Sequence, residues 1–193
     1  MSDDLADLLL APEEAAAMDA HGRIDAAVLI PMHGWPENPG LVFTERRHDL
    51  RRHAGEVSFP GGRRDRGEGL IDTALREAEE EIGLGRDEVE IAGALPPVGT
   101  FVTSYKVHPF VGVIAEGLPF EPNPAEVESV IVASLDDLVA GYGQRRLIRR
   151  GVPIRTDTYE VGGALIWGAT ARILRLLLER LGRFPADAPP AAP

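Results

Sequence analysis

The spacing of apolar and polar residues along the chain predicts a mixture of strands and helices. Strands are expected where short apolar or alternating runs are bounded by glycine, proline or polar residues: 24–30, 41–45, 56–59, 89–94, two runs within 101–114, and 129–133. Short helices are expected at 2–10, ending near Pro12, and at 135–139. The pattern therefore predicts an α/β (α+β) fold.

Two longer segments show the periodicity of amphipathic helices. Between 71 and 82 the apolar residues recur at helical spacing, and Gly83 follows as a C-terminal stop. Between about 165 and 181 the apolar residues form a continuous stripe, which is more typical of a core than of a cofactor site. Pro60-Gly61-Gly62 interrupts the strand that precedes the first of these helices and predicts a turn.

Length and composition limit the organisation of the chain. The 193 residues, 44% of them apolar and 26% charged, suit one soluble domain over 1–184, and no apolar run is long enough to span a membrane. Residues 185–193 have too little apolar bulk to pack, so we expect a disordered tail. The acidic N-terminus does not resemble a secretory signal, so we expect a cytoplasmic protein. Without cysteine, any metal must use oxygen or histidine ligands.

The distribution of charge points to a small ligand. A net charge of −11 argues against general nucleic-acid binding, which depends on summed positive charge. Eight of the twenty basic residues nevertheless fall within one stretch, and this suits a small phosphorylated ligand unless the stretch is simply a solvated basic face. They are Arg46, Arg47, Arg51, Arg52, Arg63, Arg64, Arg66 and Arg76.

The helix expected at 71–82 also carries three carboxylates on one face. At about 100° per residue, Glu77, Glu80 and Glu81 lie beside the apolar stripe. A like-charge i,i+4 pair such as Glu77 and Glu81 costs about 0.2–0.5 kcal/mol, and a divalent cation would reverse the sign of that interaction. Oxygen ligands of this kind suit Mg²⁺ or Mn²⁺. Taken alone, an acidic run is more often a solvated face.

The residues around these glutamates give them a specific context. Seven residues stand in the spacing G-x5-E-x7-R-E-U-x-E-E-x-G-U, where U is an apolar residue: Gly62, Glu68, Arg76, Glu77, Glu80, Glu81 and Gly83. This resembles the Nudix box in full, and seven fixed identities make it a highly specific match. The resemblance implies a Nudix fold, with a loop–helix–loop unit placed against a mixed sheet that is sandwiched between helices.

The resemblance also implies a metal-dependent diphosphate hydrolase. Its metal ligands would be Glu77, Glu80 and Glu81, joined by the carbonyl of Gly61, with Mg²⁺ or Mn²⁺ as the cofactor. The metal would neutralise the diphosphate and lower the pKa of an attacking water.

Two further roles follow from the same resemblance. Arg76 would pair with Glu68 and orient the helix from behind the metal ligands. The general base that takes the proton of the water is left open between Glu80, which the box favours, and Glu126, which lies outside it and is otherwise an exposed loop acid.

The sequence before the box narrows the substrate. Residues 50–62, preceded by 41–46, look like the signature of the coenzyme A pyrophosphatase branch, although Glu56 stands where that branch commonly has glutamine. Residues 96–109 and 166–171 are similar to the same branch. The resemblance implies cleavage of coenzyme A, or a derivative, to 3′,5′-ADP and 4′-phosphopantetheine.

Four residues are candidates for binding that substrate. Arg46, Arg51 and His53 would lie near its phosphates, and Tyr105 would stack on adenine. The alternatives are a structural role for His53 and a half-buried strand position for Tyr105.

Two other functions stay in view at this point. One is a Nudix hydrolase of ADP-ribose or another nucleotide-linked diphosphate. The other is a non-catalytic Nudix-fold binding module, which would have no need for the intact set of three glutamates. In each case the partner is a small molecule, and the oligomeric state, a homodimer included, is left open.

Overall fold

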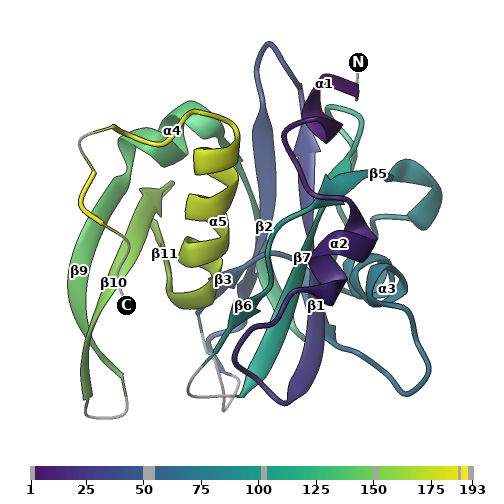
Figure 1. The fold of residues 1–193 in the computed structure, drawn as a ribbon, viewed down its shortest axis with the longest axis horizontal. Coiled ribbons are helices and arrows are strands. Elements are labelled where there is room, and N and C mark those ends of the chain that lie inside the picture. Colours follow the sequence, from purple (N-terminus) through teal and green to yellow (C-terminus); the bar gives the residue numbers. More distant parts are fainter. Residues whose placement is uncertain (1–2, 50–54, 101–103, 150–151, 187, 191–193) are drawn as a thin grey trace.

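A computed structural model describes residues 3–49, 55–100, 104–149, 152–186 and 188–190. Its centre is a twisted sheet in which the strands follow the order β3-β2-β1-β7-β5, while β4 pairs with β1, β6 with β7 and β8 with β2 (Figure 1). The pair β1–β7 is parallel and the other pairs are antiparallel, so the predicted mixed sheet is confirmed. The bounds are β1 Ile24–His33, β2 Gly40–Arg46, β3 Val57–Ser58, β4 Gly61–Arg63, β5 Glu90–Ala94, β6 Val98–Gly99, β7 Tyr105–Val113 and β8 Val127–Ser134.

Helices cover both faces of this sheet. Alternate residues of β1 point to opposite faces, so that Leu29 packs with α3 and Ile30 packs with α5. The face of Leu29 is covered by α2 (Pro12–Ala17) and α3 (Leu70–Ile82). The other face is covered by α4 (Leu135–Ala140) and α5 (Gly168–Arg180), with α1 (Asp3–Ala6) against its margin. The expected sandwich of a mixed sheet between helices is confirmed.

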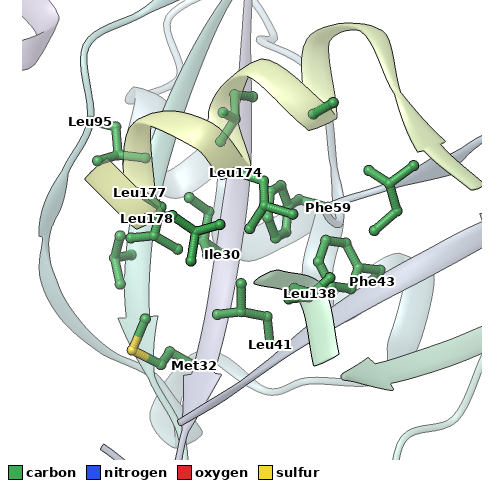
Figure 2. Packing of buried hydrophobic residues seen from close by; sticks show 14 of the residues in the cluster. Ile30, Met32, Leu41, Phe43, Phe59, Leu95, Leu138, Leu174, Leu177 and Leu178 are labelled. Atoms are coloured by element: carbon green, nitrogen blue, oxygen red, sulfur yellow. The ribbon is translucent and has the colours of Figure 1, made fainter. Parts of the chain in front are cut away.

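The apolar stripe of α5 forms the larger part of the core. Leu174, Leu177 and Leu178 lie over the side chains of β1 and β2 (Figure 2). Below them Phe43 stacks on Phe59 with ring centroids 4.6 Å apart. Each large side chain buried in this way contributes about 1.5–3 kcal/mol, so the helix is fixed by packing rather than by intrinsic propensity. The sequence prediction that this stripe belongs to the core is confirmed.

A second, three-stranded sheet lies beside α5 and was not predicted. It consists of β9 (Tyr142–Arg149), β10 (Val152–Val161) and β11 (Ala164–Trp167), paired antiparallel in the order β11-β10-β9. The last helix was expected from about residue 165, but it begins at Gly168. Leu165 and Ile166 extend the helical apolar pattern, yet they pair with β10 because Gly162 and Gly163, both at positive φ, close a tight hairpin.

Three other boundaries differ from the sequence predictions. Pro12 was expected to end the first helix; instead it begins α2, where a missing N–H is tolerated. Two runs were expected within 101–114, but 105–113 form one strand that pairs with β1 along its length. The predicted turn at Gly61 and Gly62 is the strand β4. The remaining predicted strands and the helix at 135–139 are present within a few residues.

No helix in the described parts of the chain has the length and apolar character needed to cross a membrane. The domain boundary at 184 and the disorder of 185–193 stay predictions. Two carbonyls of that segment accept hydrogen bonds from the folded part: Pro189 from Arg175 Nη1 at 3.2 Å and Pro190 from Gln144 Nε2 at 3.0 Å.

Candidate active site

Helix α3 presents its acidic face beside the sheet because its apolar face is buried against it. Ala74, Ala78 and Ile82 are fully buried with Leu29 of β1, and this fixes the rotation of the helix. Gly83 ends the helix in the left-handed conformation (φ 69°), as predicted, and its N–H caps the last turn. Glu77, Glu80 and Glu81 are therefore held on the flank of α3 that faces β4 and the loop before β8.

The glycines of β4 let the main chain approach the glutamates. The position that a Cβ of Gly62 would take lies 2.3 Å from Glu77 Oε1, so a side chain at this position would displace the carboxylate. The N–H of Gly61 points at Glu81 Oε2, 3.4 Å away. The pairing Ala27↔Gly62 and Val28↔Gly61 with β1 sets this approach. Gly61 is thus required by close contact with the main chain of β1, and Gly62 leaves room for the carboxylate of Glu77.

Arg76 contacts three of the other predicted residues. Its Nε and Nη2 donate to the two oxygens of Glu68, at 2.8 and 3.2 Å, so the expected pair is present and is bidentate. Its Nη1 donates to Glu77 Oε1 at 2.9 Å and to Glu80 Oε2 at 3.1 Å. Thr73, which sequence reasoning missed, donates its hydroxyl to Glu68 Oε2 at 2.7 Å. Its position three residues before Arg76 on α3 was the available signal.

The carboxylates of the site differ in how well their charge is compensated. The hydrogen bond from Arg76 lowers the pKa of Glu68 to about 2. Burial raises the pKa of Glu77 despite its bond to Arg76. Burial, followed by repulsion from Glu77, raises the pKa of Glu81 to about 8. The site therefore holds a carboxylate, Glu81, whose negative charge lacks compensation from the protein.

The loop before β8 brings Glu126 to the same place. The N–H of Asn123 donates to the carbonyl of Glu81 at 2.8 Å, which ties the loop to the end of α3. The charge of Glu126 contributes to raising the pKa of both Glu77 and Glu81, so the three carboxylates are close enough to repel one another. Arg46 Nη1 lies 3.6 Å from Glu126 Oε2. Arg46 and Glu126, which are distant in sequence, are thus adjacent in the fold.

Arg47 holds this loop in place, and sequence reasoning did not single it out from the arginine-rich stretch. Its main-chain N–H donates to the carbonyl of Glu126 at 3.0 Å, and its Nη1 donates to the carbonyl of Pro124. Its Nε and Nη2 bind both oxygens of Asp49, at 2.8 and 2.6 Å. Arg47 therefore bridges the end of β2 and the loop that carries Glu126.

The other predicted substrate residues are placed less directly. Arg51 and His53 lie outside the described residues. Tyr105 begins β7, opposite Ile24 of β1, and its partly buried ring packs against the core. Its main-chain N–H donates to Thr100 Oγ1 at 2.9 Å and is therefore not available to a ligand.

The donor set fits a hard divalent cation, although it is not arranged around one. Within the described residues, no three His, Asp or Glu side chains are placed closely enough to hold a metal ion. The carboxylates of Glu77 and Glu80 both contact Arg76 Nη1 instead. Glu81, whose pKa is raised, supplies carboxylate oxygens of the kind that Mg²⁺ prefers, and the main-chain N–H of Gly61 lies against it.

Comparisons with known proteins point to one family. The family model of the NUDIX domain matches residues 24–151. Proteins named "Uncharacterized Nudix hydrolase NudL" from Escherichia fergusonii and Shigella flexneri are each 41% identical over 163 residues, which cover 83% of this chain and 84% of the relative.

Solved structures show the same fold at low sequence identity. An Ap4A hydrolase from C. elegans superposes with a TM-score of 0.51 at 16% identity, covering 61% of this chain and 85% of that one. A MutT/nudix family protein from Enterococcus faecalis gives 0.54 at 15% identity, covering 88% and 71%. The extent of the family match, together with the intact box on α3, shows that the chain belongs to the Nudix family and is a hydrolase of a nucleotide-linked diphosphate.

Proposed function

We propose that the chain hydrolyses coenzyme A, or a derivative of it, at the diphosphate, giving 3′,5′-ADP and 4′-phosphopantetheine. The observation that carries the proposal is the run 41–62, which is similar to the signature of the coenzyme A pyrophosphatase branch. The described part of this run forms β2, β3 and the start of β4, and it brings Arg46 to Glu126 and Gly61 to Glu81 of α3. Its residues are therefore in a position to select the substrate.

The metal would be Mg²⁺ or Mn²⁺, bound by Glu77, Glu80, Glu81 and the carbonyl of Gly61. When bound, it supplies charge neutralisation at the diphosphate and acidifies a coordinated water. The protein contributes the orientation of these donors, because Arg76 and Glu68 fix the face of α3 on which they lie. To bind together, Glu77 and Glu80 must turn from Arg76 toward Glu81.

The general base is proposed to be Glu126, with Glu80 as the second candidate. Glu80 Oε2 is already engaged by Arg76 Nη1 at 3.1 Å. Glu126 is half-exposed and lies near Glu77 and Glu81, and within the described residues its carboxylate has only a long contact of 3.6 Å, to Arg46. A carboxylate in that position can accept the proton of an attacking water at Oε1 or Oε2.

Arg46 is proposed to bind the diphosphate. Its side chain is 37% exposed and its guanidinium makes only a 3.6 Å contact to Glu126 within the described residues, so its Nη groups can donate to a phosphate oxygen. Arg51 and His53 are proposed to lie near the same phosphates, and Tyr105 is proposed to contact adenine.

The experiment is to incubate the protein with coenzyme A or ADP-ribose in the presence of Mg²⁺ and to resolve the products by chromatography. We expect 3′,5′-ADP and 4′-phosphopantetheine from coenzyme A, with a higher kcat/KM than for ADP-ribose. Preferential turnover of ADP-ribose would overturn the assignment. Glu126→Gln and Glu80→Gln, compared across pH, separate the two candidate bases, since only loss of the base removes the acidic limb of the kcat profile.

A further inference from the structure

A pocket rich in arginine lies directly beyond the glycines of the active site. It has a volume of about 380 Å³ and is formed where the start of β1 meets the end of β4 and the loop that follows. Its charged lining consists of four arginines and two aspartates: Arg23, Arg63, Arg64, Arg66, Asp25 and Asp65. We call it the arginine pocket. None of these residues belongs to the metal ligands or to the candidate bases.

The arginine pocket has an excess of positive charge that the protein does not neutralise. Arg64 Nη1 pairs with Asp25 Oδ2 at 3.3 Å, and the same aspartate lies 3.5 Å from the buried ring of His108. Arg23, Arg63 and Arg66 are exposed and form no ion pair within the described part of the chain. With two aspartates against four arginines, the lining carries a net charge of +2 in a chain whose net charge is −11.

The loop that presents these arginines is held from its inner side. The N–H of Arg64 donates to the carbonyl of Asp25 at 3.0 Å, which fixes the loop to β1. The N–H of Asp65 donates to Glu68 Oε2 at 3.1 Å, and Glu68 is itself held by Arg76. The guanidinium groups therefore project from a main chain that is ordered before a ligand arrives, and this lowers the entropic cost of binding.

The arginine pocket also lies at a defined distance from the diphosphate site. Arg63 is two residues beyond Gly61 on β4, which corresponds to about 6.6 Å along a strand. Its carbonyl accepts a hydrogen bond from Arg76 Nη2 at 3.4 Å, so Arg76 links the pocket to the acidic face of α3. An anion attached to the same sugar as the diphosphate would be within reach of an arginine side chain at this position.

We propose that the arginine pocket binds a phosphomonoester of the substrate, and that in coenzyme A this group is the 3′-phosphate. The inference rests on the proposed function, because coenzyme A carries a phosphomonoester and the diphosphate on one ribose, separated by the carbons C3′ to C5′. Arginine binds a phosphate dianion through parallel N–H···O bonds, which a lysine cannot reproduce. The pocket would thus select coenzyme A over nucleotide diphosphates that lack a 3′-phosphate.

The first test compares coenzyme A with dephospho-coenzyme A, which differs only by the 3′-phosphate. The wild type is expected to prefer coenzyme A in kcat/KM. Arg63→Ala and Arg66→Ala are each expected to reduce that preference about tenfold, the effect of losing one charge-assisted contact. Arg180→Ala, which removes an exposed arginine on α5, serves as the matched control and should keep the preference. An equal loss for both substrates, or no loss, would overturn the proposal.

A second measurement separates this proposal from the assignment of the reaction. Calorimetry of 3′,5′-ADP and 5′-AMP binding needs no turnover, and the wild type should bind 3′,5′-ADP more tightly. The Arg63→Ala/Arg66→Ala double variant should lose this difference in affinity. The single variant Arg63→Lys should retain only part of it. If coenzyme A is not hydrolysed but the binding difference depends on these arginines, the proposed function fails and the phosphomonoester pocket stands. Equal affinities in the wild type would overturn the pocket.

Discussion

Asp157 and Glu81 are carboxylates withdrawn from solvent in two parts of the same molecule, and their surroundings differ in kind. Asp157, on β10, is 1% exposed, and its charge is fully met. It accepts hydrogen bonds from Tyr142 Oη at 3.1 Å and from Gln144 Nε2 at 2.8 Å, and it pairs with Arg175 Nη1 at 3.4 Å. The network joins β9, β10 and α5, and it stabilises their packing.

Glu81, on α3, has no comparable set of donors. Within the described residues its carboxylate accepts one hydrogen bond, from the N–H of Gly61 at 3.4 Å, and the charges of Glu77 and Glu126 repel it while that of Arg46 attracts it. Buried polar groups are normally satisfied, so a carboxylate held in this state is a cost to the fold that an external cation would remove. The satisfied carboxylate thus serves structure, whereas the unsatisfied one lies at the proposed metal site.

Asp157→Ala tests the structural half of the comparison. The substitution leaves the buried guanidinium of Arg175 without its most buried partner, so the free energy of unfolding should fall by about 3 kcal/mol, as measured by urea denaturation. Glu160→Ala, which breaks the exposed pair with Arg145, is the control and should have a much smaller effect. Turnover per folded molecule should be retained in both, and its loss in Asp157→Ala would break the comparison.

Glu81→Gln tests the functional half. The amide removes a proposed metal ligand, and kcat should fall on the order of a hundredfold, equivalent to about 2.7 kcal/mol. In metal-free buffer at pH 8 its thermal stability should equal or exceed that of the wild type, because repulsion with Glu77 is relieved. Glu79→Gln, an exposed neighbour on α3, should change neither quantity. A collapse of stability together with activity would assign Glu81 to the fold.

The raised pKa of Glu81 also predicts how pH and metal act together. Its carboxyl has a pKa of about 8 in the folded protein, against 4.5 for the ordinary group. Between these two pH values it is protonated in the folded protein and charged in the unfolded chain. The contribution of Glu81 to stability is therefore fully present below pH 4.5 and is lost as pH rises toward 8. Thermal melting should show this decline without metal, and Mg²⁺ should reduce it by about 1–2 kcal/mol at concentrations well above its dissociation constant. A decline unaffected by Mg²⁺ would contradict metal binding at Glu81.

Much of the fold around the site could be predicted because local signals and tertiary structure agree there. Helix α3 has a regular apolar face and a glycine stop, and both predictions are confirmed. The strand β11 was missed because the apolar residues Leu165 and Ile166 suit a strand and a helix equally, and only pairing with β10 decides.

The candidate site was predictable in its identities but not in its contacts. The spacing of the box identifies Glu77, Glu80 and Glu81, yet it gives no indication that Arg76 binds two of them in the absence of a metal. The adjacency of Arg46 and Glu126 depends on how β2 pairs with β8 across a register shift, and no local pattern encodes that pairing.

Glu68→Gln gives the smallest expected effect and asks whether Arg76 depends on its partner. Arg76 lowers the pKa of Glu68 from 4.5 to about 2, so the pair stabilises the fold fully above pH 4.5 and loses this contribution as pH falls toward 2. Because both side chains are partly exposed, the variant should lose only about 1 kcal/mol at pH 7. The difference in free energy of unfolding from the wild type, measured by urea denaturation, should shrink as the pH falls. The control variant Asp87→Asn, at an exposed site, should not differ from the wild type in this quantity. A difference that is independent of pH would mean that the charge of Glu68 does not hold Arg76, and that the face of α3 is fixed by packing alone.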